Sequence, residues 1–180
     1  MIETDRLRLR GWHARDREPF AAMSADPDVM AHLGGPVGRA ASDAIVARLT
    51  VGQEEQGHCF WAVERKKDGA MIGFCGLRRG GHAGTPVPDV LEIGWRLARS
   101  AWGQGFALEA AQASLAWGWR NTPDARIVAW TVPANIRSWG LMERLGMAHR
   151  VELDFDHPAF EPGNPLRRHI VYTIDRPQGA

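Results

Sequence analysis

The segment from Val90 to Trp119 constrains the fold more than any other part of the chain. Residues 90–98, "VLEIGWRLA", alternate apolar side chains with others, which is typical of a half-buried β-strand. Gly103 and Gly105 follow, and an alanine-rich amphipathic stretch begins directly after them. A glycine turn between a strand and a helix leaves backbone N–H groups free to face an anion. The segment therefore predicts an anion-binding strand–turn–helix unit.

Length and composition predict one soluble domain, residues 1–180, with a substantial core. The chain has 180 residues, of which 44% are hydrophobic and 24% are charged. The formal net charge of +1 argues against a nucleic-acid partner. We find no apolar run of about 20 residues and no signal-peptide pattern at the start, so we expect a cytoplasmic protein without membrane association. Cys59 and Cys75 are too few for a disulfide framework, and we expect both in the core.

Periodicity and breakers predict strands that alternate with helices. We expect strands at residues 3–10, 58–65, 70–78, 89–98, 126–132, 148–155 and 168–174. We expect helices at residues 16–23, 40–56 and 105–120, and a short helix that Asn135 opens and Gly146 ends. This order predicts a single α/β domain of the mixed α+β kind.

Three kinds of phosphate site compete for the glycine turn. A P-loop needs a lysine and a hydroxyl after its second glycine, but Phe106 and Ala107 follow Gly105. A dinucleotide fingerprint needs a third glycine, and Leu108 occupies that position. The third is a turn whose N–H groups receive a pyrophosphate at the positive end of the helix dipole. A plain turn with packing glycines is the alternative without a ligand.

Several separated motifs resemble one family. The runs "EIGWRLARSAWGQGFALEAA" and "NIRSWGLMERLGM" resemble the GCN5-related N-acetyltransferase (GNAT) superfamily. The opening "TDRLRLRGW", the hairpin "WAVERKKDGAMIGFCGL" and the tail resemble its RimJ/RimL-like branch of ribosomal-protein N-terminal acetyltransferases. The resemblance covers nearly the whole chain in order. It implies the GNAT acyl-CoA N-acyltransferase fold: a central, mostly antiparallel sheet, flanked by helices and splayed in a V between its fourth and fifth strands, residues 91–97 and 126–132.

The resemblance also implies a site for the cosubstrate acetyl-CoA. Backbone N–H groups from about Gln104 to Ala107 receive the pyrophosphate, and Trp102 stands where glutamine or arginine is usual. The strand at residues 91–97 lines the pantetheine arm. Asn135 contacts the pantetheine or fixes the strand end; alternatively it caps the helix, and both roles are compatible. The implied cofactor-binding residues are Ile93, Gly94, Trp95, Trp102, Gly103, Gln104, Gly105, Phe106, Ala107, Asn135 and Ser138.

For catalysis, the resemblance implies direct attack of an amine on the acetyl-CoA carbonyl. Many members protonate the leaving thiolate with a tyrosine, but Met142 occupies that position and the one tyrosine is Tyr172. Ser138 or water is then the acid, unless Ser138 is a solvated helix hydroxyl. Glu92 is the candidate general base, because alternation points it away from Leu91, Ile93 and Trp95. We expect no metal, since the residues of "HRVELDFDHP" match no standard zinc spacing.

The sequence does not identify the amine that accepts the acetyl group. A protein N-terminus, an aminoglycoside-like antibiotic, a polyamine and an amino-acid derivative all fit. At pH 7.4 an α-amine is about a quarter neutral and a lysine amine only about 0.1%, so weak acid–base machinery favours an amine of low pKa. The branch resemblance places the loop at residues 156–158 near the acceptor entrance and makes a homodimer possible. A non-catalytic acyl-CoA sensor and an ATP- or NAD-binding module are the alternatives from other classes.

Overall fold

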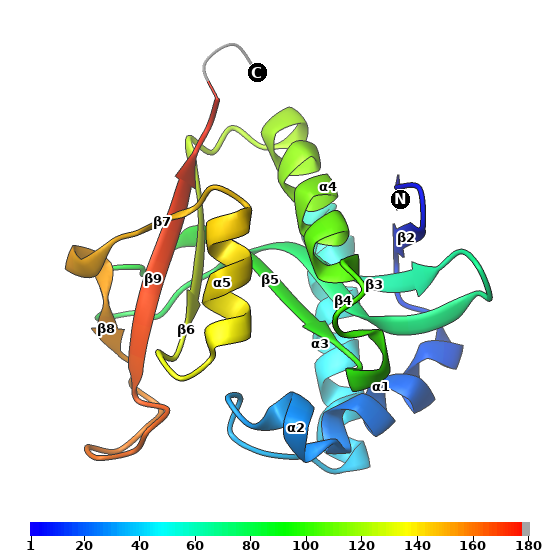
Figure 1. The fold of residues 1–180 in the computed structure, drawn as a ribbon, viewed down its shortest axis with the longest axis horizontal. Coiled ribbons are helices and arrows are strands. Elements are labelled where there is room, and N and C mark those ends of the chain that lie inside the picture. The colour runs from blue at the N-terminus through cyan, green and yellow to red at the C-terminus, as the bar shows by residue number, and fades with distance from the viewer. Residues whose placement is uncertain (178–180) are drawn as a thin grey trace.

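The computed structural model describes residues 1–177, and Figure 1 shows their arrangement. The strands are β1 (Ile2–Glu3), β2 (Leu7–Arg10), β3 (Phe60–Arg65), β4 (Ala70–Gly80), β5 (Val90–Leu97), β6 (Arg126–Thr131), β7 (Ala148–His149), β8 (Phe155–Asp156) and β9 (Arg168–Asp175). The α-helices are α1 (Arg17–Ala25), α2 (Pro27–Met30), α3 (Arg39–Gln56), α4 (Phe106–Asn121) and α5 (Ile136–Arg144). Short 3-10 turns cover Ala14–Asp16, Arg99–Ala101 and Val151–Leu153.

The strands form one sheet that opens in its middle. Its order is β1-β2-β3-β4-β5-β6-β9-β7, with β8 paired to β9, and every pairing except β5–β6 is antiparallel. β4 and β5 stay paired from Gly73–Leu97 to Gly80–Val90, whereas β5 and β6 share the single pair Glu92–Val128. The two strands diverge from there (Figure 1). The predicted mixed fold and its V between the fourth and fifth predicted strands are confirmed.

The two faces of the sheet carry different helices. α4 and α5 pack on one face, and α1 and α3 pack on the other (Figure 1). On β5, Leu91, Ile93 and Leu97 join the core under α4. Because side chains alternate along a strand, Glu92 and Arg96 point to the face that α3 covers. This confirms the direction predicted for Glu92.

Two predicted strands are interrupted. Residues 148–155 form no continuous strand, because Asp154 accepts hydrogen bonds from the Val171 N–H (2.9 Å) and the His149 ring (3.0 Å) and turns the chain between β7 and β8. Residues 3–10 form a hairpin of β1 and β2, closed by hydrogen bonds between Thr4 and Leu7. The breaker-rich segment after α1 also contains the short helix α2.

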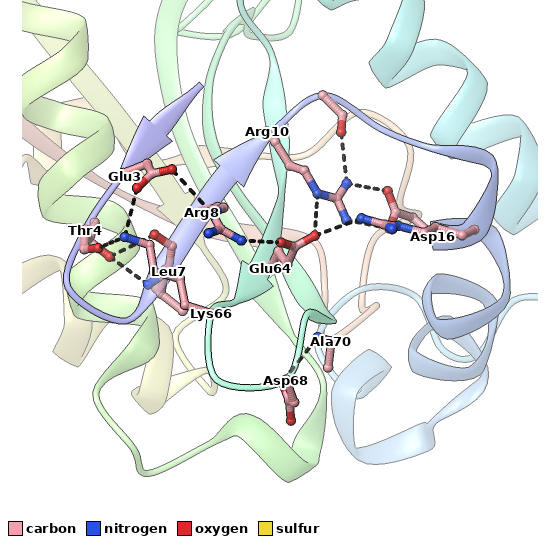
Figure 2. Close-up of polar contacts among 12 residues, drawn as sticks. Glu3, Thr4, Leu7, Arg8, Arg10, Asp16, Glu64, Lys66, Asp68 and Ala70 are labelled. Atoms are coloured by element: carbon pink, nitrogen blue, oxygen red, sulfur yellow. Dashed lines mark hydrogen bonds and ion pairs between the residues drawn. The ribbon is translucent and has the colours of Figure 1, made fainter.

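A buried ionic cluster of Arg10, Asp16 and Glu64 fastens the N-terminal strands to the sheet. Figure 2 shows Arg10 between the two carboxylates. Its guanidinium donates to Asp16 at 2.7 and 2.9 Å and to Glu64 at 2.8 Å. Hydrogen bonding from Arg10 holds the pKa of Glu64 below its ordinary value. Burial opposes ionisation of Asp16, but the bonds from Arg10 and the His13 N–H still lower its pKa.

Two further observations concern residues 1–177. None of their helices is long and apolar enough to cross a membrane. No three His, Cys, Asp or Glu side chains in this range gather into a possible metal site. The cytoplasmic location and the lack of a metal in the reaction stay predictions. Cys59 and Cys75 are buried and unpaired, as expected.

Candidate active site

The glycine turn has the backbone geometry of an anion site. Gly103 and Gly105 adopt φ values of +72° and +79°, which residues with a Cβ rarely adopt. The first hydrogen bond of the 16-residue helix α4 runs from the Glu109 N–H to the Gly105 carbonyl, and no side chain caps the helix. The N–H groups from Gly105 to Leu108 therefore have no acceptor within the helix. They lie at the positive end of its dipole.

Side chains of the turn bond to carbonyl groups nearby. Trp102 donates its indole N–H to the Leu97 carbonyl at 2.8 Å, and thus holds the turn to the end of β5. Gln104 donates its side-chain amide to the Ser100 carbonyl at 2.8 Å. The Gln104 side chain thus bonds within the loop, which agrees with ligand binding through the main chain at this position.

Two arginines that sequence reasoning did not single out border the turn. Arg6 donates to the Gln104 carbonyl at 2.9 Å and pairs with Glu109 at 2.6 Å. Arg137, at the start of α5, lies over the Trp102 ring at 4.6 Å. Arg137 directly precedes Ser138 in the run "NIRSWGLMERLGM", which resembles the GNAT superfamily. Arg6 becomes a neighbour only because β2 and α4 meet in the fold.

Asn135 follows β6 and opens α5 as its N-cap residue, as predicted. Its side-chain amide donates to the Thr131 hydroxyl at 3.0 Å, and its side chain accepts no backbone N–H of α5. A side-chain cap is therefore absent, whereas the other predicted role, fixing the strand end, agrees with this bond. Ser138 donates its backbone N–H to the Asn135 carbonyl at 3.0 Å and is half-buried. The two residues share the first turn of α5, beside the opening.

Glu92 lies where β5 and β6 separate. Its side chain is buried, and Arg78 on β4 donates to one carboxylate oxygen at 2.8 Å. Burial raises the pKa of Glu92, and the Arg78 guanidinium partly opposes that increase. A carboxylate whose pKa is raised toward neutrality is a stronger base than an exposed one. Glu92 therefore has a suitable position and environment to accept a proton.

Met142 and Tyr172 give the site no acid. Met142 is 1% exposed and belongs to the core under α4. Tyr172 is also buried in that core, where its ring stacks on His149 at 5.0 Å. Burial, with the nearby Glu143 carboxylate, raises the pKa of Tyr172. Because neither residue can act as the acid, the hydroxyl group of Ser138 on α5 is the candidate beside the V.

The face that carries Glu92 also carries the predicted acceptor loop. His157 lies 4.2 Å from His82, ring to ring, and His82 lies 5.8 Å from Trp130 on β6. Trp130 packs with Val128, on the face opposite α4 and α5. On the β5 side of this face, a 370 Å³ pocket under α3 is lined partly by Arg78, the partner of Glu92. A second hollow, of 320 Å³, lies at the C-terminal end of α4, away from the turn.

Comparisons with known proteins agree with this geometry. The family model of the acetyltransferase (GNAT) domain matches residues 6–148. The chain is 32% identical over 153 residues to the uncharacterized protein YkkB of Bacillus subtilis (strain 168), which covers 81% of this chain and 84% of that protein. The fold is similar to that of a GNAT-family acetyltransferase from Bacillus anthracis, with a TM-score of 0.79, 24% identity and coverage of 97% and 98%.

Two similar structures contain coenzyme A. RimL, a ribosomal alpha-N-protein acetyltransferase in complex with CoA, matches with a TM-score of 0.74, 14% identity and coverage of 96% and 95%. The spermidine N-acetyltransferase from Vibrio cholerae, in complex with CoA and spermine, matches with a TM-score of 0.73, 16% identity and coverage of 96% and 97%. At these identities the similarity concerns the fold. Together with the family match over residues 6–148, these findings show that the chain belongs to the GNAT acetyltransferases and is an acyltransferase enzyme.

Proposed function

We propose that this enzyme transfers the acetyl group of acetyl-CoA to a primary amine by direct nucleophilic attack. One observation carries the proposal: N–H groups without an acceptor in the helix, at a left-handed glycine turn, stand beside a V-shaped opening in the sheet. The turn from Trp102 to Ala107 receives the CoA pyrophosphate through its main chain. The pantetheine arm then lies along residues 93–95 and reaches Asn135 and Ser138. The two CoA complexes with this fold support this assignment.

The chemistry uses two side chains of the V. The amine nitrogen forms a bond to the acetyl carbon, the carbon–sulfur bond breaks, and CoA leaves as a thiolate. Glu92 accepts the amine proton, directly or through water. Ser138 or water returns a proton to the thiolate, whose conjugate acid has an ordinary thiol pKa of about 8.5 and thus needs little help to leave.

The acceptor belongs to one of two classes. The RimJ/RimL-like motifs favour a protein N-terminal α-amine, and the RimL structure supports that branch by its fold. A small-molecule amine is the alternative, and the spermine complex shows the same fold in an enzyme of that kind. The pocket under α3, lined by apolar side chains and arginines, favours a small molecule. We also propose that residues 1–180 act as a single domain, which the continuous sheet supports.

Thermal unfolding with CoA, acetyl-CoA, ATP and NAD tests the ligand. At 100 times its Kd, a ligand of the native state adds about 2.7 kcal/mol, or roughly 5–10 °C for a chain of this size. We expect CoA and acetyl-CoA to raise Tm and the nucleotides to leave it unchanged. Equal stabilisation by ATP or NAD would overturn the proposal in favour of a nucleotide-binding module.

Gly105→Ala and Gly57→Ala form a matched pair for the turn. Both glycines have positive φ, +79° and +74°, so alanine strains both backbones by about 1–2 kcal/mol. Gly57 ends α3, and a Cβ there meets nothing within 4 Å. We expect similar losses of Tm, but loss of CoA stabilisation in Gly105→Ala alone. Equal CoA stabilisation in both variants would place the pyrophosphate elsewhere.

Turnover separates an enzyme that works through these residues from a CoA sensor. With an amine panel, we expect CoA release by the natural chain and at least tenfold slower release by Glu92→Gln. Ser138→Ala should slow release about tenfold if the hydroxyl is the acid, and leave it unchanged if water is. CoA binding without release for any amine would support the sensor.

A further inference from the structure

The pocket under α3 combines an apolar wall with cations. Its volume is 370 Å³, within the range of small-molecule sites. Phe60 and Phe74 line it from the sheet and stack with ring centroids 5.2 Å apart, and Leu49 lines it from α3. Arg78 lies over the Phe60 ring at 5.0 Å, and Arg96 lies over the Phe74 ring at 5.3 Å. The stacked rings therefore stand between two guanidinium groups.

Arg96 is the unusual member of this pocket. Its Nε and Nη1 atoms are buried, and neither has a hydrogen-bond partner among the described residues. Burial lowers its pKa to about 10, so the side chain remains a cation at neutral pH. A buried charge without a partner is costly to the fold. Contacts with Phe74 and Phe20 alone do not replace the lost hydration.

The other charges in the pocket do not neutralise Arg96. No carboxylate lines the pocket in the described part of the chain. Arg78 pairs with Glu92 and Arg79 pairs with Asp124. Arg48, on α3, lines the same pocket and makes no ion pair within residues 1–177. Two cations thus face a space without an anion, and their field favours a negatively charged group there.

Building on the proposed acetyl transfer, we propose that this pocket binds a carboxylate carried by the acceptor amine itself. Arg96 and Arg48 hold the carboxylate, Phe60 and Phe74 contact the apolar part, and the amine lies toward Glu92. Glu92 and Arg96 are four residues apart on β5, so about 13 Å separates their α-carbons. Side chains on one face of a strand project side by side, so the carboxylate and the amine of such an acceptor must lie several ångströms apart. The acceptor is therefore a small amine bearing a carboxylate.

The first experiment compares matched acceptors with the full chain and acetyl-CoA. The probes are 5-aminopentanoate, 6-aminohexanoate and 8-aminooctanoate, each beside its carboxamide, and CoA release is the readout. We expect kcat/KM to be at least tenfold higher for the carboxylates. In these ω-amino acids the carboxylate is remote from the amine, so the two members of each pair have similar intrinsic reactivity. A preference for the carboxylate must therefore come from the protein.

Arg96→Met tests the proposed ligand directly. We expect KM for the preferred carboxylate to rise at least tenfold, while KM for acetyl-CoA and turnover of the carboxamides stay unchanged. We also expect Tm to rise, because the variant removes an unpaired buried charge. A purely structural arginine would show the opposite, a lower Tm with unchanged selectivity. Arg79→Met is the control: it removes a cation of the same pocket that Asp124 already pairs, and should keep the preference.

Binding of a product-like ligand keeps the test independent of turnover. The products 6-acetamidohexanoate and 8-acetamidooctanoate should raise the Tm of the natural chain but not that of Arg96→Met, and their carboxamides should do neither. If CoA stabilises the chain but no amine is acetylated, the proposed function fails and this binding test alone decides on the pocket. If amines are acetylated without preference, or the preference survives Arg96→Met, the carboxylate site is overturned and acetyl transfer stands.

Discussion

Two arginines with buried guanidinium nitrogens, the buried Arg10 and the half-buried Arg96, have different surroundings. Arg10, at the N-terminal edge of the sheet, forms short hydrogen bonds with the buried carboxylates of Asp16 and Glu64 (Figure 2). Arg96, under α3, has two buried guanidinium nitrogens without a partner in the described chain. The difference shows that burial of an arginine is no guide to its role. The paired guanidinium of Arg10 stabilises the fold, and the unpaired guanidinium of Arg96 belongs to the proposed carboxylate site.

The neighbours of each residue explain the difference. Arg8, next but one to Arg10 on β2, stands opposite Glu64, and the turn before α1 brings in Asp16. Arg96 on β5 stands opposite Phe74, and α1 covers it with Phe20. The first surroundings supply carboxylates, and the second supply only aromatic rings. Aromatic faces attract a guanidinium but accept none of its hydrogen bonds in the plane of the group.

Arg10→Met should have the largest effect on stability. It leaves two buried carboxylates without their main partner, a change that costs about 3–5 kcal/mol at such sites. We expect the lower end of this range, because Arg8 and Arg15 still reach Glu64 at 3.2 and 3.1 Å. Calorimetry should then show a Tm roughly 6–12 °C lower. If Arg10→Met and Arg96→Met shift Tm in the same direction, the contrast between the two arginines is wrong.

The pH dependence of stability should differ in sign between Glu64 and Glu92. The pKa of Glu64 is lowered in the fold, so its contribution is present above the unfolded pKa and lost as the pH falls through the folded one. Glu64→Gln should therefore lower Tm at pH 7 and matter least in acid. The pKa of Glu92 is raised, so its ionised form opposes folding above that pKa. Glu92→Gln should raise Tm at pH 8, and the gain should shrink toward pH 4.

Unfolding curves between pH 3 and 8 for both variants provide the measurement. Parallel Tm profiles for Glu64→Gln and Glu92→Gln would show that the two carboxylates share one environment. The same pH series should show acetyl transfer rising with pH as Glu92 loses its proton. That rise should change shape in Glu92→Gln if the carboxylate is the base.

Arg137→Ala should have the smallest effect. Arg137 is exposed and lies over Trp102 at 4.6 Å, and a cation–π contact at an exposed site contributes about 0.5–1 kcal/mol. We expect Tm to fall by a few degrees at most. Since Arg96 also lies over an aromatic ring, opposite shifts in Arg137→Ala and Arg96→Met would show that burial, and not the ring contact, decides the outcome. A large decrease in Tm for Arg137→Ala would instead show that the contact between Arg137 and Trp102 is important for the stability of the fold.

Local patterns predicted the features that depend on neighbours in the chain. Alternation along residues 90–98 predicted a strand and the direction of Glu92, because a strand's side chains alternate whatever lies around it. Gly103 and Gly105 predicted the turn, because their left-handed backbone is a property of each residue. The resemblance predicted the V, which is found where β5 and β6 keep one pair.

Predictions failed where distant residues intervene. The alternation of residues 148–155 favoured a strand, but Asp154 bonds to the Val171 N–H, and no local pattern indicates that partner. Arg6 contacts the glycine turn by donating to the Gln104 carbonyl and pairs with Glu109, both about a hundred residues later in the chain.

The sequence by itself determined the family, the strand–turn–helix unit and the face of β5 on which Glu92 lies. These depend on φ preferences and on a period of two, which act over a few residues. Only the tertiary structure decided that Arg10 is paired and Arg96 is not. Both are arginines in strands, and although Asp16 lies six residues after Arg10, only the fold brings Asp16 and Glu64 onto its guanidinium and leaves Arg96 among aromatic rings. The environment of a buried charge is supplied by other elements, and the cost or gain of burying it depends on those partners.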